Sequence, residues 1–265
     1  KLPAARGRID VDPATEHRSY PSEVFVAGDA RRALEALAAR LDGRMRIDPA
    51  FAADIAAARR EAEAGLRRTA GAYAPMLDVL ERAMPRDALW VRDITLANTI
   101  WGNRAPAIRD PRNSILALGG GIGQGLAMAV GAALGGGGRK TVALIGDGGL
   151  QLGLGELATL AETRADVVLL LMTDGGYGVI RNMQDNDYGG RRCYADLKTP
   201  NFGMVAEALG IPHRPVRAMA GFAPAFAEAL AMTGPVILEL DMAAIGPFGV
   251  RAGGFPPAPA WAGRR

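Results

Sequence analysis

Two carboxylates stand at the ends of two neighbouring apolar runs in this chain. One residue separates Asp147 from the run 141–145, and two residues separate Asp174 from the run 167–171. Both runs are rich in Val, Ile and Leu, which is typical of buried parallel strands, and residues 150–163 between them have the pattern of a helix. Because the carboxyl ends of parallel strands meet at one edge of a sheet, we expect the two carboxylates to lie close together.

The glycines around both carboxylates indicate a site for a metal ion that holds a phosphate. Mg²⁺ takes oxygen ligands and commonly shares them with substrate phosphates. Glycine lets the backbone approach a ligand closely, and the free N–H groups at a helix start favour an anion. One Gly-Asp-Gly segment by itself is also compatible with a simple strand-to-helix turn capped by Asp. The second carboxylate, Asp174, favours the metal site over that alternative.

Composition excludes several other classes of protein. The chain has 265 residues, 49% of them hydrophobic and 22% charged, with a net charge of +3, which is typical of a globular protein. No apolar run reaches the roughly 20 residues of a membrane span, and no signal peptide is recognisable. The single cysteine, Cys193, cannot form an internal disulfide and fits a reducing, cytoplasmic location. The arginine pairs lack interleaved aromatic residues, so we expect no binding to nucleic acid.

The elements that position these residues predict an α/β fold. We expect a parallel sheet flanked by helices, preceded by the remnant of a second α/β domain, because residues 1–42 show strand, turn, strand and helix but are too few for a whole domain. The predicted parts are the partial domain 1–42, a linker 43–75 containing an exposed helix, the main domain 76–250, and a tail 251–265.

Two separate blocks of the main domain resemble thiamine diphosphate-dependent enzymes. The segment 146–148 together with 173–178 resembles the family's diphosphate-binding motif, and residues 119–132 resemble its glycine loop and following helix. The resemblance covers roughly residues 76–248 and is strongest to the branch of acetolactate synthase, benzoylformate decarboxylase and related 2-oxo acid decarboxylases.

This resemblance implies a role for each matching residue. Asp147, Asp174 and the main-chain carbonyl of Gly176 would hold Mg²⁺. Ile122 would wedge under the cofactor and bend it, and the carbonyl of Gly120 would accept a hydrogen bond from its amino group; these two are the catalytic candidates. The positions expected to contact thiamine diphosphate are Asp93, Thr95, Gly120, Gly121, Ile122, Gly146, Gly148, Gly149, Tyr177, Gly178 and Val179.

Asp174 departs from the family pattern, which usually has Asn at this position. The carboxylate keeps the ligating oxygen but adds a negative charge beside the diphosphate. The adjoining helix supplies Val179, Ile180 and Met183 as candidates to line a substrate pocket, whereas we interpret Arg181 as a solvated helix residue. His213 is interpreted as a loop residue without a role.

The resemblance further implies an enzyme, a lyase or transferase that decarboxylates a 2-oxo acid, joins two carbonyl compounds into an acyloin, or both. In the family a glutamate on a separate pyrimidine-binding domain protonates the cofactor. No glutamate here lies in a matching motif. We therefore expect this chain to supply the diphosphate and metal half of the site, and to work with a missing domain or subunit in a homo-oligomer, a dimer or tetramer.

Two alternatives come from other classes of protein. A non-catalytic binding module built on the thiamine fold is favoured by Asp174 and by the missing domain. A dinucleotide-binding oxidoreductase is suggested by the glycines of 119–123 after an apolar run, but no acidic residue follows at the spacing that a ribose requires. The particular 2-oxo acid, the choice between decarboxylation and carboligation, and any use of FAD are not readable from the sequence.

Overall fold

The computed structural model describes residues 6–249, and the chain divides into two compact units between Arg59 and Arg60. In the first unit, β1 (Gly7–Asp10) pairs in parallel with β2 (Val24–Ala27). Helix α1 (Ala30–Leu41) follows and is capped by the side chain of Asp29. None of the described residues of this unit is buried, so these elements have no apolar core of their own. Helix α2 (Phe51–Ala70) begins in the first unit and ends in the second.

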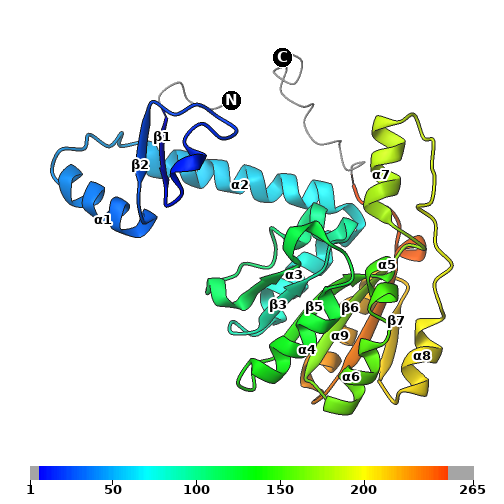
Figure 1. Cartoon of the computed structure of the whole chain (residues 1–265). Helices are drawn as coiled ribbons and strands as arrows, with labels where there is room; N and C mark the ends of the chain where they lie inside the picture. The colour runs from blue at the N-terminus through cyan, green and yellow to red at the C-terminus, as the bar shows by residue number, and fades with distance from the viewer. Residues whose placement is uncertain (1–5, 250–265) are drawn as a thin grey trace. The chain divides into compact units, whose positions relative to one another are not determined.

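The second unit is built on a six-stranded, all-parallel sheet with the order β4-β3-β5-β6-β8-β7 (Figure 1). Its strands are β3 (Leu89–Arg92), β4 (Ser114–Leu116), β5 (Thr141–Gly146), β6 (Val167–Thr173), β7 (His213–Val216) and β8 (Val236–Asp241). All six residues of the central strand β5 are buried, whereas the edge strands β4 and β7 are shorter and carry exposed or polar residues. Such edges resist pairing with another chain.

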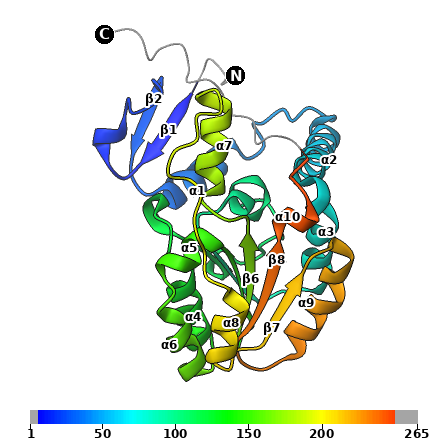
Figure 2. The same ribbon diagram turned by 90° about the vertical axis from the view of Figure 1, so that its right-hand side faces the viewer.

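Helices cover both faces of this sheet, as Figure 2 shows edge-on. One face packs against α3 (Ala74–Ala83) and α9 (Phe222–Ala231), and the other against α4 (Gly125–Gly135), α6 (Glu156–Thr163) and α8 (Phe202–Ala208). Three further helices follow the carboxyl ends of strands: α5 (Asp147–Leu152), α7 (Gly178–Asp187) and α10 (Met242–Ile245). Single turns connect the elements: Pro13–Thr15, Gly71–Tyr73, Asn98–Gly102, Pro111–Asn113, Leu118–Gly120 and Met219–Gly221.

The core consists of two apolar clusters, one on each face of the sheet. The α3 side contains Trp90 and Trp101, both 0% exposed and stacked with their ring centroids 6.3 Å apart. The α4 side contains Leu126 and Phe202. Alternate residues of the central strands contribute to the two clusters, as a sheet covered on both faces requires. The predicted fold class, a parallel sheet flanked by helices, is confirmed.

The predicted helix over residues 150–163 is wrong in one respect. The chain forms two helices there, α5 and α6, which are separated by Gly153–Gly155. A Cβ on Gly153 would stand 3.2 Å from the carbonyl oxygen of Gly123, so the break lets this segment lie directly against the glycine loop. The predicted domain boundaries stay predictions, and the predicted tail 251–265 lies outside the described residues.

Across residues 6–249, no helix combines the length and apolar character needed to cross a bilayer.

Candidate functional site

The site lies where loops leave the sheet in opposite directions. The chain leaves β3 toward β4 on one side, and leaves β5 toward β6 on the other. Arg92 pairs with Leu144, and Gly146 pairs with Met172, so β5 and β6 end within one residue of each other and β3 ends two residues short of β5. In open parallel sheets, ligands bind in the crevice at such a switch point.

A pocket of about 520 Å³ opens at these strand tips. It is lined by residues from the ends of β3, β5 and β6, from the glycine loop and from the start of α7: Ile94, Thr95, Leu96, Gly120, Ile122, Gly146, Asp147, Gly148, Gly149, Asp174, Gly176, Tyr177, Gly178, Val179 and Ile180. Of the residues predicted to hold the cofactor or metal, only Asp93 and Gly121 do not line it. Met183, a substrate-pocket candidate, is not among the lining residues either.

Asp147 is a buried carboxylate, 1% exposed, at the carboxyl tip of β5. Its Oδ1 accepts a hydrogen bond from the Gly148 N–H at 2.8 Å, and its Oδ2 accepts one from the Gly175 N–H at 2.7 Å. Burial, and then the nearby charge of Asp174, raise the pKa of Asp147 to about 6. Burial and the charge of Asp174 therefore destabilise the ionised form of Asp147, and a cation beside the carboxylate would stabilise it.

Asp174 follows β6 and lies within hydrogen-bonding reach of the Asp147 carboxyl group. Burial raises the pKa of Asp174, although Arg181 opposes that shift. The two carboxyl groups thus line the same pocket, which their placement on neighbouring strands predicts; a common metal ion stays a prediction. Oδ2 of Asp174 lies against Gly178, where any Cβ would overlap it.

Arg181 is not the solvated residue that we expected from the sequence. Its side chain is only 16% exposed. The Arg181 Nη2 lies 2.8 Å from Oδ1 of Asp174 and donates to the Asp174 main-chain oxygen at 2.7 Å, while Nη1 lies 3.3 Å from Asp196. The first turn of α7 folds back over the end of β6, which brings Arg181 to the carboxylate seven positions earlier.

Asp93 holds the glycine loop in place through hydrogen bonds to its backbone. It is 0% exposed, and its Oδ2 accepts hydrogen bonds from Gly123 N–H at 2.9 Å and Gly125 N–H at 3.2 Å, while Oδ1 accepts one from Ile94 N–H at 2.7 Å. A Cβ on Gly125 would stand 2.7 Å from the Asp93 Cβ, so only glycine allows this approach. The predicted contact of Asp93 with the cofactor stays a prediction; its observed contact is with the loop.

The residues around the pocket fit a magnesium diphosphate. Asp147 and Asp174 offer anionic oxygens, and the Gly176 carbonyl oxygen lies 3.4 Å from the place where a Cβ on Gly148 would stand. Such a Cβ would also meet the Tyr177 ring at 2.8 Å, so the cradle leaves room for backbone only. Residues 6–249 contain no group of three His, Cys, Asp or Glu side chains that could hold a metal; the predicted set has two carboxylates and one main-chain oxygen.

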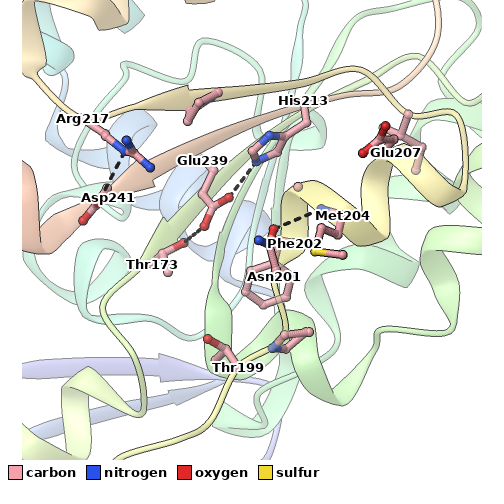
Figure 3. Close-up of a pocket in the computed structure, with 14 residues that line it drawn as sticks. Thr173, Thr199, Asn201, Phe202, Met204, Glu207, His213, Arg217, Glu239 and Asp241 are labelled. Atoms are coloured by element: carbon pink, nitrogen blue, oxygen red, sulfur yellow. Dashed lines mark hydrogen bonds and ion pairs between the residues drawn. The ribbon is translucent and has the colours of Figure 1, made fainter.

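A second pocket, of about 900 Å³, shares no residue with the first (Figure 3). His213, expected in a loop, begins β7 here, and its Nε2 lies 2.7 Å from Oε2 of Glu239 on β8. Thr173 at the end of β6 donates to Oε1 of Glu239 at 3.1 Å. These contacts join three neighbouring strands. This pocket is larger, but the buried carboxylate Asp147 and the cluster of glycines line the smaller one, so the smaller pocket is the better candidate site.

Comparison with known proteins identifies a family and several similar proteins. Residues 97–240 match the family described as thiamine pyrophosphate enzyme, C-terminal TPP binding domain. A probable 2-ketoarginine decarboxylase of Pseudomonas aeruginosa is 39% identical over 178 residues, which is 66% of this chain and 32% of that protein. The catabolic acetolactate synthase of Raoultella terrigena is 28% identical over 88% of this chain and 43% of its own length.

The solved structure of the Rhodococcus jostii RHA1 thiamine diphosphate-dependent 4-hydroxybenzoylformate decarboxylase has the same fold. It matches with a TM-score of 0.67 and 23% identity, over 89% of this chain and 43% of that chain. The chain therefore spans less than half the length of these similar proteins.

Proposed function

The chain belongs to the family of thiamine pyrophosphate-dependent 2-oxo acid decarboxylases and acetolactate synthases, as a C-terminal TPP-binding domain, and on this premise we propose that it carries the diphosphate and Mg²⁺ half of such an active site. The observation that supports this most directly is the pair of carboxylates at neighbouring strand tips, the buried Asp147 and the half-buried Asp174, in a pocket otherwise formed largely by glycine backbone and apolar side chains.

In this proposal each residue of the pocket has a separate task. Asp147, Asp174 and the Gly176 carbonyl hold Mg²⁺. The backbone at Gly148 and Gly149 receives the diphosphate, since the start of a helix after a strand favours an anion; the Gly148 N–H also donates to Oδ1 of Asp147. Ile122, half-buried at the pocket wall, supports the organic part of the cofactor and helps to keep water from it.

When bound, thiamine diphosphate supplies the electron sink that accepts electrons as a 2-oxo acid loses CO₂. The names of three similar proteins support this substrate class: a probable 2-ketoarginine decarboxylase, a benzoylformate decarboxylase and an acetolactate synthase. We propose decarboxylation of a 2-oxo acid, acyloin carboligation, or both. Val179 and Ile180, which line the pocket beside the metal ligands, are the proposed contacts for the substrate side chain.

The other half of the site is proposed to come from a pyrimidine-binding domain or subunit, within a homo-oligomer. Of the described residues that line the pocket, only Asp147 and Asp174 are acidic, and both belong to the metal site. The group that protonates the aminopyrimidine ring must therefore be supplied from outside this lining.

Two measurements test the proposal. Calorimetry should detect binding of thiamine diphosphate that requires Mg²⁺. Hydrogen–deuterium exchange at the thiamine C2 should be slow with this chain alone and fast after a pyrimidine-binding domain is added. Fast exchange by the chain alone would refute the half-site proposal. Absence of Mg²⁺-dependent binding even with the added domain would refute the function and favour a non-catalytic module.

A further inference from the structure

Arg181 faces the metal site from a position that the proposed chemistry does not use. It is largely buried, and it contacts Asp174 twice, at Oδ1 (2.8 Å) and at the main-chain oxygen (2.7 Å). Its other neighbour, Asp196, is 70% exposed and 3.3 Å away, so that contact is weak in water. The guanidinium is therefore committed to Asp174.

The two oxygens of Asp174 have different surroundings. Oδ1 pairs with Arg181, while Oδ2 lies against the backbone of Gly178, and the carboxyl group as a whole approaches Asp147. Because one nitrogen, Nη2, contacts both the side-chain Oδ1 and the main-chain oxygen of Asp174, Arg181 restricts the rotation of the carboxylate. One oxygen is thereby left for a cation shared with Asp147.

Arg181 also alters the charge balance of the pocket. Asp147 and Asp174 together bring two negative charges to a buried site that must also accept a diphosphate. Both charges would strengthen the binding of a cation by itself, but they would repel the diphosphate. One buried positive charge beside Asp174 reduces that repulsion and at the same time weakens the attraction for the metal.

We propose that Arg181 is a positioning residue that orients Asp174 toward the shared metal and offsets its charge, so that the site accepts metal and diphosphate together. This inference rests on the proposed function. It predicts effects of opposite sign: removal of the Arg181 charge strengthens binding of the metal alone and weakens binding of the anion at saturating metal. A role in structure alone would weaken both, because a loosened α7 would disturb every ligand.

The test uses the full chain with two probes, Mn²⁺ followed by electron paramagnetic resonance and inorganic pyrophosphate followed by calorimetry at saturating Mg²⁺. In Arg181→Gln, Mn²⁺ alone should bind at least about tenfold more tightly and pyrophosphate at least about tenfold more weakly, the lower limit being the effect of one charge about 5 Å from a divalent ion at the dielectric constant of water. Arg181→Lys, which keeps the charge but not the planar fork, should restore most of the pyrophosphate affinity.

Two further variants keep the test decisive if Arg181→Gln folds poorly. Asp174→Asn removes the opposite charge and should reverse both signs, and the double variant Asp174→Asn/Arg181→Gln should bind pyrophosphate about as well as wild type. Arg192→Gln is the matched control: it breaks an ion pair of 2.7 Å to Asp185 on the same helix, away from the pocket, and should change neither affinity.

The outcomes separate the two proposals. Changes of the same sign for both probes in Arg181→Gln, or no change beyond that of Arg192→Gln, would overturn the role of Arg181 while the wild-type binding leaves the proposed function standing. If the wild-type chain binds neither Mn²⁺ nor pyrophosphate, the proposed function fails, and the role of Arg181 toward a metal fails with it.

Discussion

The substitution Asp93→Asn examines how the glycine loop is held in place. The Asp93 carboxylate accepts three backbone hydrogen bonds in a site that is 0% exposed: two from Gly123 and Gly125 at one oxygen, and one from Ile94 at the other. Asn has the same shape but only one acceptor oxygen. If that oxygen faces the loop, the new NH₂ group faces the Ile94 N–H at a spacing of about 2.7 Å, donor against donor. Rotating the amide instead sacrifices both loop bonds.

The cost is one charge-assisted hydrogen bond plus one buried donor left without an acceptor. We expect the free energy of unfolding of the second unit to fall by about 2–4 kcal/mol. Urea denaturation should show a midpoint lowered by roughly 1 M, and hydrogen exchange should quicken at the Gly123 and Gly125 amides. Asp87→Asn, at an exposed turn residue, is the control. A loss below about 0.5 kcal/mol, the range of ordinary surface changes, would refute the assignment of Asp93 as the support of the loop.

Three other predictions concern the pocket. The pKa of Asp147 rises from 3.8 to about 6 on folding, so the folded chain without metal binds this proton more tightly than the unfolded chain. The free energy of unfolding should therefore fall by about 3 kcal/mol as pH rises from about 4 to 7. Asp147→Asn should remove this pH dependence in urea titrations, and an unchanged pH dependence would contradict the prediction. Gly178→Ala should weaken Mg²⁺-dependent thiamine diphosphate binding at least about tenfold in calorimetry, because the Cβ overlaps Asp174 Oδ2; binding equal to wild type would count against that carboxylate as a ligand. Ile122→Ala should weaken binding of thiamine diphosphate about tenfold through lost apolar contact and leave the affinity for pyrophosphate unchanged. Equal losses of affinity for both ligands would contradict the contact between Ile122 and the organic part of the cofactor.

Much of the candidate site follows from local patterns in the sequence. Two apolar runs of strand length with a helical segment between them are typical of parallel strands in one sheet, and the carboxyl ends of parallel strands meet at the same edge. The sequence therefore predicted that Asp147 and Asp174 lie at one edge, whereas only the tertiary structure made β5 and β6 direct neighbours: β4 and β5, which also have a helix between them, are separated by β3. The glycines beside them predicted where a ligand could touch the backbone, and all but two of the residues predicted to hold the cofactor or metal line one pocket.

Other features depend on contacts between residues that lie in different segments of the chain. The periodicity of apolar residues along one segment does not predict such contacts. The pattern of α7 makes Arg181 look like a surface residue, because only the path of the chain after β6 turns it back onto Asp174. His213 resembles a loop residue between prolines until β8 brings Glu239 beside it. Asp93 reaches amides some 30 residues away. Sequence periodicity specifies which face of an element is apolar, whereas the burial of a charge and the identity of its partner are properties of the packed whole.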